Sequence, residues 1–255
     1  MLADPVTLPR LALAQAWEWE RVGPPHPVIG MVDVWLEDDV VGRFEDLTRQ
    51  VLAEPGFYDL RRDRFVGEFR DLLLATANAE SECYCFSSTS DGQTTATLAV
   101  PAGRSAVRYT VDGDRVTLSK FPRHKLVAAV VESLPECPPA DIHPFSVARP
   151  AYESRDDSEA YSLDTTSDYT VPDSAERLRT LMTARRIGGH QLYVASRVGR
   201  VRSTSMPLTA VDTAEYGRVL TYLQDRPDGE EITCGPGSAY YVTQTLENTL
   251  QALGD

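Results

Sequence analysis

Residues 82–121 read ECYCFSSTSDGQTTATLAVPAGRSAVRYTVDGDRVTLSKF, and they carry the pattern that decides the fold. Apolar and polar residues alternate along this stretch. Turn-forming residues interrupt the alternation at intervals, which predicts short strands joined by turns. Asp112-Gly113 is the strongest of these turn signals, because Asp-Gly supplies the positive φ angles that a two-residue hairpin needs. The predicted strands are 82–87, 94–100, 105–111 and 115–121.

Helical periodicity surrounds these strands. The predicted helices of this half are 10–22, 37–53, 61–77 and 123–134. A short extended piece is predicted at 28–34. Pro55-Gly56 ends the helix at 37–53, and this helix and the next, at 61–77, are expected to form a helical hairpin. The second helix is expected to bury a face made of Val40, Phe44, Leu47 and Val51.

The second half of the chain repeats the order of helix, strands and helix. A helix is predicted at 174–187, capped by Asp173 and ended by Gly188-Gly189. A final helix at 239–253 closes the chain. The strands predicted between these helices are 190–197, 200–206, 217–223 and 231–234.

Short motifs match between the two halves at one constant offset. FRDL at 69–72 corresponds to LRTL at 178–181, and CY at 83–84 corresponds to LY at 192–193. The sequence therefore predicts an internal repeat and an α+β fold. We expect a single domain, residues 1–255, made of a first half, a connection and a second half at 1–134, 135–172 and 173–255.

The connection at 135–172 has little apolar content. It includes a possible strand at 145–148 and, at 153–168, a stretch rich in Asp, Glu, Ser and Thr. Such a stretch buries too little apolar surface to offset the entropy of ordering it. We expect a mobile acidic loop there.

Charge and composition exclude several classes of protein. A net charge of −13 repels nucleic acid and anionic membranes. No apolar run reaches the ~20 residues of a membrane span, and the acidic N-terminus lacks the basic start of a signal peptide, so a cytoplasmic protein is expected. The cysteines lack the spacing of zinc ligands, and neither a metal nor a cofactor is expected. They are Cys83, Cys85, Cys137 and Cys234.

No constellation typical of an enzyme stands out. Ser238, His190 and Asp212 are the residue types of a hydrolase triad, but no Gly-x-Ser-x-Gly motif supports them. The Gly-Pro-Gly-Ser run at 235–238 predicts a turn followed by a helix N-cap at Ser238, since it lacks the lysine of a phosphate-binding loop. We expect no catalytic residues.

The second half resembles the EspG family, the cytosolic chaperones of type VII (ESX) secretion in actinobacteria. The resemblance is carried by GGHQLYVA at 188–195, GRVR at 199–202, PLT at 207–209, DT at 212–213 and GR at 217–218. It implies a pseudo-two-fold fold with a central antiparallel sheet flanked by helical bundles. It also implies binding to helical secretion substrates, PE–PPE pairs or related pairs, whose hydrophobic tip the chaperone covers to keep them soluble.

In that family the hairpin between the first two strands of the first half meets the substrate, which points to residues 87–94 here. The small polar side chains of this hairpin can exchange hydrogen bonds with a partner helix. The predicted partner-binding residues are Ser88, Ser90, Asp91, Gln93 and Thr95, with Tyr240 and Tyr241 on the last helix as the other candidates. The alternative function is that of an enzyme or small-ligand protein with a pocket between the two halves.

Overall fold

The computed structural model describes residues 2, 4–30, 37–154 and 174–254. Its main feature is an antiparallel sheet of eleven strands in the order β1-β7-β6-β5-β4-β9-β11-β12-β13-β8, with β10 beside β9. The strands of the first half are β1 (Val6–Pro9), β4 (Ser81–Thr89), β5 (Thr94–Ala102), β6 (Ser105–Asp112) and β7 (Arg115–Pro122). The others are β8 (Phe145–Ala148), β9 (Arg186–Val198), β10 (Val201–Thr204), β11 (Leu208–Thr213), β12 (Gly217–Arg226) and β13 (Gly229–Pro236).

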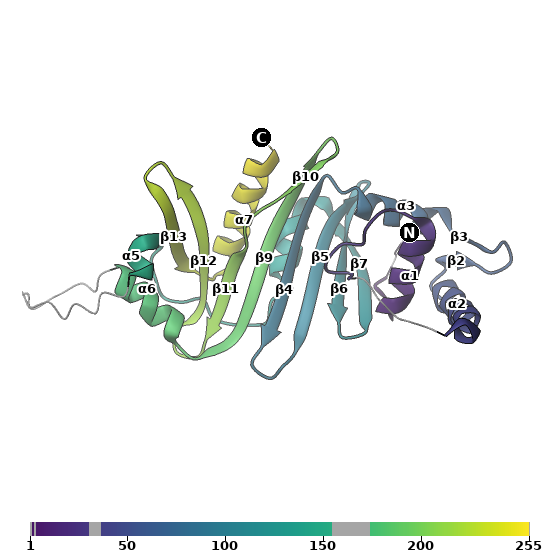
Figure 1. Cartoon of the computed structure of the whole chain (residues 1–255), viewed down its shortest axis with the longest axis horizontal. Coiled ribbons are helices and arrows are strands. Elements are labelled where there is room, and N and C mark those ends of the chain that lie inside the picture. Colours follow the sequence, from purple (N-terminus) through teal and green to yellow (C-terminus); the bar gives the residue numbers. More distant parts are fainter. Residues whose placement is uncertain (1, 3, 31–36, 155–173, 255) are drawn as a thin grey trace, which may run out of the picture.

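Helices gather at the two ends of this sheet (Figure 1). One end holds α1 (Arg10–Glu20), α2 (Asp38–Ala53), α3 (Gly67–Ala77) and a small hairpin of β2 (Tyr58–Asp59) and β3 (Arg64–Phe65). The other end holds α5 (Arg149–Glu153) and α6 (Ser174–Thr183). The remaining helices are α4 (Leu126–Val131), preceded by a 3-10 turn at Arg123–Lys125, and α7 (Ala239–Gly254). Helices around an antiparallel sheet confirm the predicted α+β class.

Alternation along β4 sends neighbouring side chains to opposite faces of the sheet. Cys83 and Cys85 lie on one face, in a core cluster with Val130 of α4 and Val242 of α7. Tyr84 faces the other way and belongs to a cluster shared with α1 and α3. A third cluster joins α6 to β8 and β12. Each face of the sheet therefore has its own core.

The two sets of strands meet where β4 pairs with β9. Tyr84 lies directly opposite Tyr193 in this pairing. The two rings stack with their centroids 4.9 Å apart and their planes 10° from parallel. Backbone hydrogen bonds and stacked aromatic rings thus join the halves into one continuous sheet.

Every predicted strand is present, but four strands, β1, β2, β3 and β11, were not predicted. β11 has the sequence LTAVDT, and both Asp212 and Thr213 are buried. These polar residues interrupt the apolar pattern. The Asp212 carboxylate accepts a hydrogen bond from Arg218, and the Thr213 hydroxyl donates one to the Gly217 carbonyl. Because these bonds satisfy both side chains inside the protein, the two polar residues can be buried.

The third helix begins at Gly67 and not at 61, so the predicted helical hairpin is wrong. Residues before it form the β2–β3 hairpin instead. The Asp59 carboxylate accepts hydrogen bonds from the backbone N–H groups of Arg61 and Arg62. This side-chain turn competes with helix formation. Asp63 also takes a positive φ of 47°, which a helix does not allow.

The predicted inner face of α2 is wrong in part, because Val51 packs against the core cluster but Val40 and Leu47 do not. Val40 and Leu47 are 41% and 53% exposed, whereas Thr48 and Leu52 are buried. The helix lies at the end of the molecule and contacts only α1 and β2 closely among the described elements. It therefore buries a narrow strip, and a larger apolar face stays in solvent.

Two further boundaries differ from the prediction. The α6 helix ends at Thr183, and Gly188 lies inside β9, where a Cβ atom would come within 3.2 Å of Asp212 Oδ2. Val28 lies in a turn rather than an extended piece, because Ile29 and Gly30 both donate backbone hydrogen bonds to the His26 carbonyl. Residues 31–34 of that piece, the Asp173 cap and residues 155–168 of the acidic stretch lie outside the described residues.

Candidate protein-binding surface

The tip of the β4–β5 hairpin is exposed and internally braced. Thr89 N–H donates to the Gln93 carbonyl at 3.0 Å, and Gly92 takes a positive φ of 86°. The Asp91 carboxylate accepts hydrogen bonds from the Thr89 hydroxyl and from Gln93 N–H. These hydrogen bonds lower the pKa of Asp91, the hydroxyl of Thr89 being the largest cause. Asp91 therefore holds the turn, and Ser90 and Gln93 are the side chains that the tip presents.

This hairpin is also fixed to the second half of the chain. Ser90 N–H donates to the Ile187 carbonyl at 2.9 Å, and Ser88 Oγ donates to the Gly189 carbonyl at 3.4 Å. Both acceptors lie at the start of β9. The predicted residues of the hairpin consequently lie on a rigid turn at the ends of two central strands of the sheet.

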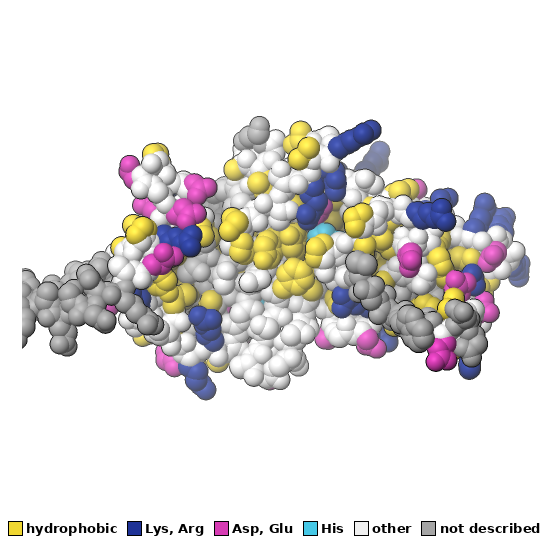
Figure 2. All heavy atoms as spheres, in the orientation of Figure 1, with side chains coloured by type: hydrophobic (Ala, Val, Ile, Leu, Met, Phe, Trp, Pro, Cys, Tyr) yellow, Lys and Arg dark blue, Asp and Glu magenta, His cyan; other side chains and the backbone are white. Residues whose placement is uncertain are grey.

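The middle of one sheet face lies between the two groups of helices, and we call it the open face. It consists of the parts of β5, β4, β9 and β11 that face away from α4 and α7. Phe86 and Tyr193 are only partly buried there. Figure 2 shows hydrophobic side chains gathered over this middle region of the sheet. Exposed aromatic residues on a rigid sheet are typical of protein-binding surfaces.

Two hollows mark the open face. One, of about 580 Å³, is lined by Phe86, Gln191 and the predicted residues Ser88 and Thr95. The other, of about 350 Å³, lies toward α5 and α6. Both include Thr209, so the hollows adjoin. The hairpin therefore forms one border of a surface that crosses both halves.

A buried ion pair stands at the opposite end of the open face from the hairpin. Glu82, with its side chain 3% exposed, accepts from Arg202 at 2.7 Å and pairs with His26 Nε2 at 3.2 Å. His26 Nδ1 accepts from Val28 N–H at 3.1 Å, so Nε2 carries the hydrogen. Burial would raise the pKa of Glu82, but hydrogen bonds from His26 and Arg202 outweigh it and lower that pKa.

This ion pair brings a cation to the aromatic stack. The Arg202 guanidinium lies 6.0 Å from the centre of the Tyr84 ring. Arginine and tyrosine are the residue types that carry much of the energy at protein interfaces. Sequence reasoning did not select Tyr84, Tyr193 or Arg202. The signal available was the CY and LY match between the halves, which places one tyrosine from each half at the same point.

The structure separates the two sets of predicted site residues. Tyr240 is 75% exposed at the start of α7, and α7 covers the face opposite the open face. Tyr241 packs against the core cluster of that covered face, close to Gly235. The two tyrosines thus do not adjoin the hairpin surface.

The residues of the hydrolase-like set have structural roles. Ser238 Oγ accepts from Tyr241 N–H at 3.2 Å, which confirms the predicted N-cap. His190 Nε2 lies 3.0 Å from Asp212 Oδ2, and Arg218 Nε donates to the other oxygen at 2.6 Å. The three residues of this ion cluster are buried. They hold β9, β11 and β12 together from inside.

The described residues contain neither a metal-binding cluster nor a membrane-spanning helix. Within residues 2, 4–30, 37–154 and 174–254, no group of three or more His, Cys, Asp or Glu side chains could hold a metal ion. Among those same residues, no helix combines the length and hydrophobicity that a membrane span needs.

Comparison with known proteins gives a family and a fold. A family model described as the EspG family matches residues 9–248. No curated protein matches the chain. Among solved structures, it is similar to the Mycobacterium tuberculosis type VII secretion system chaperone EspG5, solved in complex with a PE25-PPE41 dimer. The TM-score is 0.68 at 14% identity, with 97% of each chain covered, so the two chains share a fold.

Proposed function

Because this chain belongs to the EspG family, we propose that it is a cytosolic chaperone that binds a helical type VII (ESX) secretion substrate and keeps it soluble. The substrate is a PE–PPE-like pair whose hydrophobic tip needs cover. Binding, and not catalysis, is the activity. The observation that carries the proposal is the open face, an exposed apolar surface bordered by polar groups on a rigid sheet.

The partner is bound by the hairpin and the open face together. Ser88, Ser90, Gln93 and Thr95 offer hydroxyl and amide groups at the border, while Phe86 and its aromatic neighbours offer apolar area. Asp91 contributes by holding the turn in shape. A preformed surface of this kind loses little conformational entropy on binding.

The proposal includes the internal repeat. The strand order supports a single domain made of two copies of one unit, since β4-β5-β6-β7 on one side of the seam correspond to β9-β11-β12-β13 on the other. Superposing 65–134 on 175–253 tests this correspondence. A pseudo-two-fold axis would pass between Tyr84 and Tyr193, so the partner would bind across it.

Substitution of the hairpin tip tests the proposed site. Gln93→Arg adds bulk and charge at the tip. Among the described residues the Gln93 side chain makes no hydrogen bond that this change would remove. We expect it to weaken binding of the co-expressed substrate pair by about tenfold or more in calorimetry. Asp91→Arg is a poorer probe, because it also removes the brace of the turn.

The matched control is Tyr240→Arg, which adds the same charge at an exposed position on the opposite face. It should leave the dissociation constant unchanged. Unchanged binding by Gln93→Arg together with weak binding by Tyr240→Arg would move the site to α7 and overturn this assignment. A chain that purifies with a stoichiometric small molecule and binds no helical pair would overturn the chaperone function itself.

A further inference from the structure

The second hollow of the open face lies beside an unpaired strand edge. β12 runs from Gly217 to Arg226, but β11 pairs with it only as far as Thr221. On its other edge, β12 stays paired with β13 up to Arg226. Among the described strands, none pairs with residues 222–226 on the side of β11. The last half of β12 is therefore an edge strand within the sheet, and we call it the β12 edge.

Pro207 explains why β11 leaves this edge open. A proline has no backbone N–H to donate to a sheet, and β11 begins at Leu208, directly after it. Ser205 N–H donates to the Val194 carbonyl at 2.9 Å, and Ser205 Oγ accepts from Val194 N–H at 3.2 Å. The chain that leads into β11 is thus held beside β9, where β10 also pairs, and not beside β12.

The backbone groups on the β12 edge can be identified from the pairing. Alternate residues of an antiparallel strand direct their N–H and C=O groups to opposite edges. Pro236 lies opposite Val219 and has no N–H, so Val219 does not exchange both hydrogen bonds with β13. Steps of two residues lead from Val219 to Thr221, which pairs with β11, and then to Leu223 and Asp225. The N–H and C=O groups of these last two residues point to the open edge, and neither residue makes a backbone hydrogen bond outside the strand pairs among the described residues.

An apolar hollow adjoins the β12 edge, because residues 221–223 line it. Its volume is about 350 Å³. Leu223 shares the lining with Leu178 and Met182 of α6 and Ile232 of β13. Leu178 is buried, whereas the other three side chains are partly exposed. A methionine adapts its shape to what it contacts, so this lining suits an incoming apolar side chain.

Charges at the rim of this hollow pair with one another. Arg149 pairs with Glu153 at 2.7 Å and with Glu230 at 2.6 Å. Recognition at this place is therefore a matter of backbone groups and apolar surface.

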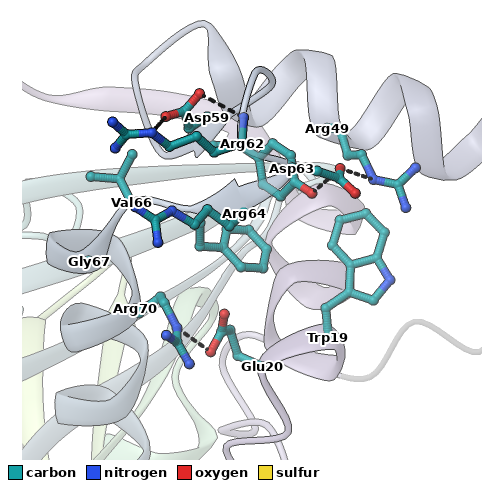
Figure 3. Close-up of a pocket in the computed structure, with 12 residues that line it drawn as sticks. Trp19, Glu20, Arg49, Asp59, Arg62, Asp63, Arg64, Val66, Gly67 and Arg70 are labelled. Carbon is teal, nitrogen blue, oxygen red and sulfur yellow. Dashed lines mark hydrogen bonds and ion pairs between the residues drawn. The ribbon is translucent and has the colours of Figure 1, made fainter.

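The pocket at the other end of the molecule, of about 550 Å³, is of a different kind. Figure 3 shows the charged side chains that line it. Arg70 pairs with Glu20 at 2.7 Å, and Arg62 pairs with Asp59 at 3.7 Å. The strands beside it, β2 and β3, are only two residues long each. The β12 edge, in contrast, places unsatisfied backbone groups next to an apolar hollow.

We propose that the β12 edge binds an extended segment of the secretion substrate as an added strand, with an apolar side chain of that segment in the hollow. This inference rests on the proposed chaperone function. Unpaired N–H and C=O groups select an extended chain, because its own backbone groups complement them, and the hollow selects an apolar side chain on one face of it. The hollow shares Thr209 with the hollow at the β4–β5 hairpin, so one substrate covers both.

The proposal says something about the substrate. A helical pair must present a stretch of extended chain, either a connection between helices or a chain end, to reach the β12 edge. It also gives binding a protective role for the chaperone, since an added strand covers an edge that otherwise invites pairing with another chain.

Hydrogen exchange of individual backbone amides, followed by NMR, tests the proposal. The free chain is compared with its complex with the co-expressed PE–PPE-like pair. In the free chain the amides of Leu223 and Asp225 should exchange fast, whereas those of Tyr222 and Gln224, which bond to β13, should be protected. In the complex, exchange at Leu223 and Asp225 should slow by about tenfold or more, because hydrogen-bonded amides exchange only when the structure opens. Tyr222 and Gln224 are the control within the same strand.

Two further measurements separate an added strand from a surface that merely covers the edge. In the complex, the amide protons of Leu223 and Asp225 should give nuclear Overhauser effects to two substrate residues that are two positions apart. Met182→Arg places a charge in the hollow and should weaken the complex by about tenfold or more in calorimetry, with an unchanged circular dichroism spectrum. The matched control is Leu74→Arg, at a position 44% exposed on α3, which should leave the dissociation constant unchanged.

The outcomes distinguish this inference from the proposed function. A complex in which Leu223 and Asp225 exchange as fast as in the free chain would overturn the added strand and leave the chaperone function standing. Contacts to consecutive residues of a substrate helix, or to a second copy of this chain, would also overturn it, as would equal effects of Met182→Arg and Leu74→Arg. Failure to form any complex would overturn the chaperone function and this inference with it.

Discussion

Asp212→Asn removes a charge from the buried ion cluster of the second half without changing the shape of the side chain. The Asp212 and Arg218 side chains are only 5% and 7% exposed, and two hydrogen bonds of 2.6 and 2.8 Å join them. The substitution leaves Arg218 buried with the Pro135 carbonyl, at 2.7 Å, as its remaining strong acceptor. Removing one partner of a buried pair costs about 3–5 kcal/mol, and we expect that loss in the free energy of unfolding.

Urea unfolding followed by circular dichroism measures this loss. The control is Arg226→Met, which breaks the exposed pair with Glu231 at 3.5 Å and should cost less than about 1 kcal/mol. A cost of Asp212→Asn no greater than that of the control would refute the view that the cluster holds the strands together.

Acid gives the same prediction an independent check. Burial would raise the pKa of Asp212, but hydrogen bonds from Arg218 and His190 outweigh it and hold this pKa well below its ordinary value. The charged carboxylate therefore contributes its full stability above the unfolded pKa of about 3.9. That contribution is lost as the pH falls toward the lower folded pKa. The difference in the free energy of unfolding between the natural chain and Asp212→Asn should be constant from pH 6 to 8 and shrink below about pH 4.

Three further substitutions or measurements test the packing. Gly217→Ala places a Cβ atom 2.3 Å from the Pro138 carbonyl oxygen at a φ of +81°. The control, Gly103→Ala, meets open space and should lose only the roughly 1–2 kcal/mol of backbone strain. Gly217→Ala should therefore lower the free energy of unfolding in urea by more than the control does. In the folded chain Cys137 should react first with a thiol reagent, because the other cysteines are buried; two fast thiols would contradict this. Tyr240→Ala should change the free energy of unfolding by at most about 0.5 kcal/mol, and a larger loss would show hidden packing at α7.

The local pattern of apolar, polar and turn-forming residues was sufficient to predict most strands of the sheet. The strands β6 and β7 bury mainly one face, so their alternation is visible in the sequence. The strands β4 and β5 are buried on both faces, and they are located by the turn residues that bound them. The pattern failed where polar groups are buried with partners, as at Asp212 in β11. It failed also where a side chain competes with the helix, as Asp59 does before α3.

The proposed binding surface was only half visible in the sequence. The turn residues that locate the hairpin tip are a local signal, and the family resemblance pointed to Ser90 and Gln93 on that tip. The open face depends on the register of β4 against β9, which sets Tyr84 opposite Tyr193 and brings Arg202 to Glu82. Those neighbours are far apart in the chain, and no periodicity within either segment reports that they meet.

The β4–β9 seam has a consequence for how the chain acquires its structure. β4, β5, β6 and β7 are consecutive hairpins, whereas the seam joins residues roughly a hundred positions apart, with Ser81 opposite Ser196. Short loops close before long ones, so the first meander forms while β4 is still an unpaired edge. During synthesis that edge waits until residues 186–198 have left the ribosome. A neighbouring nascent copy exposes the same edge, and exchange of β9 between two copies is the misassembly that this topology invites.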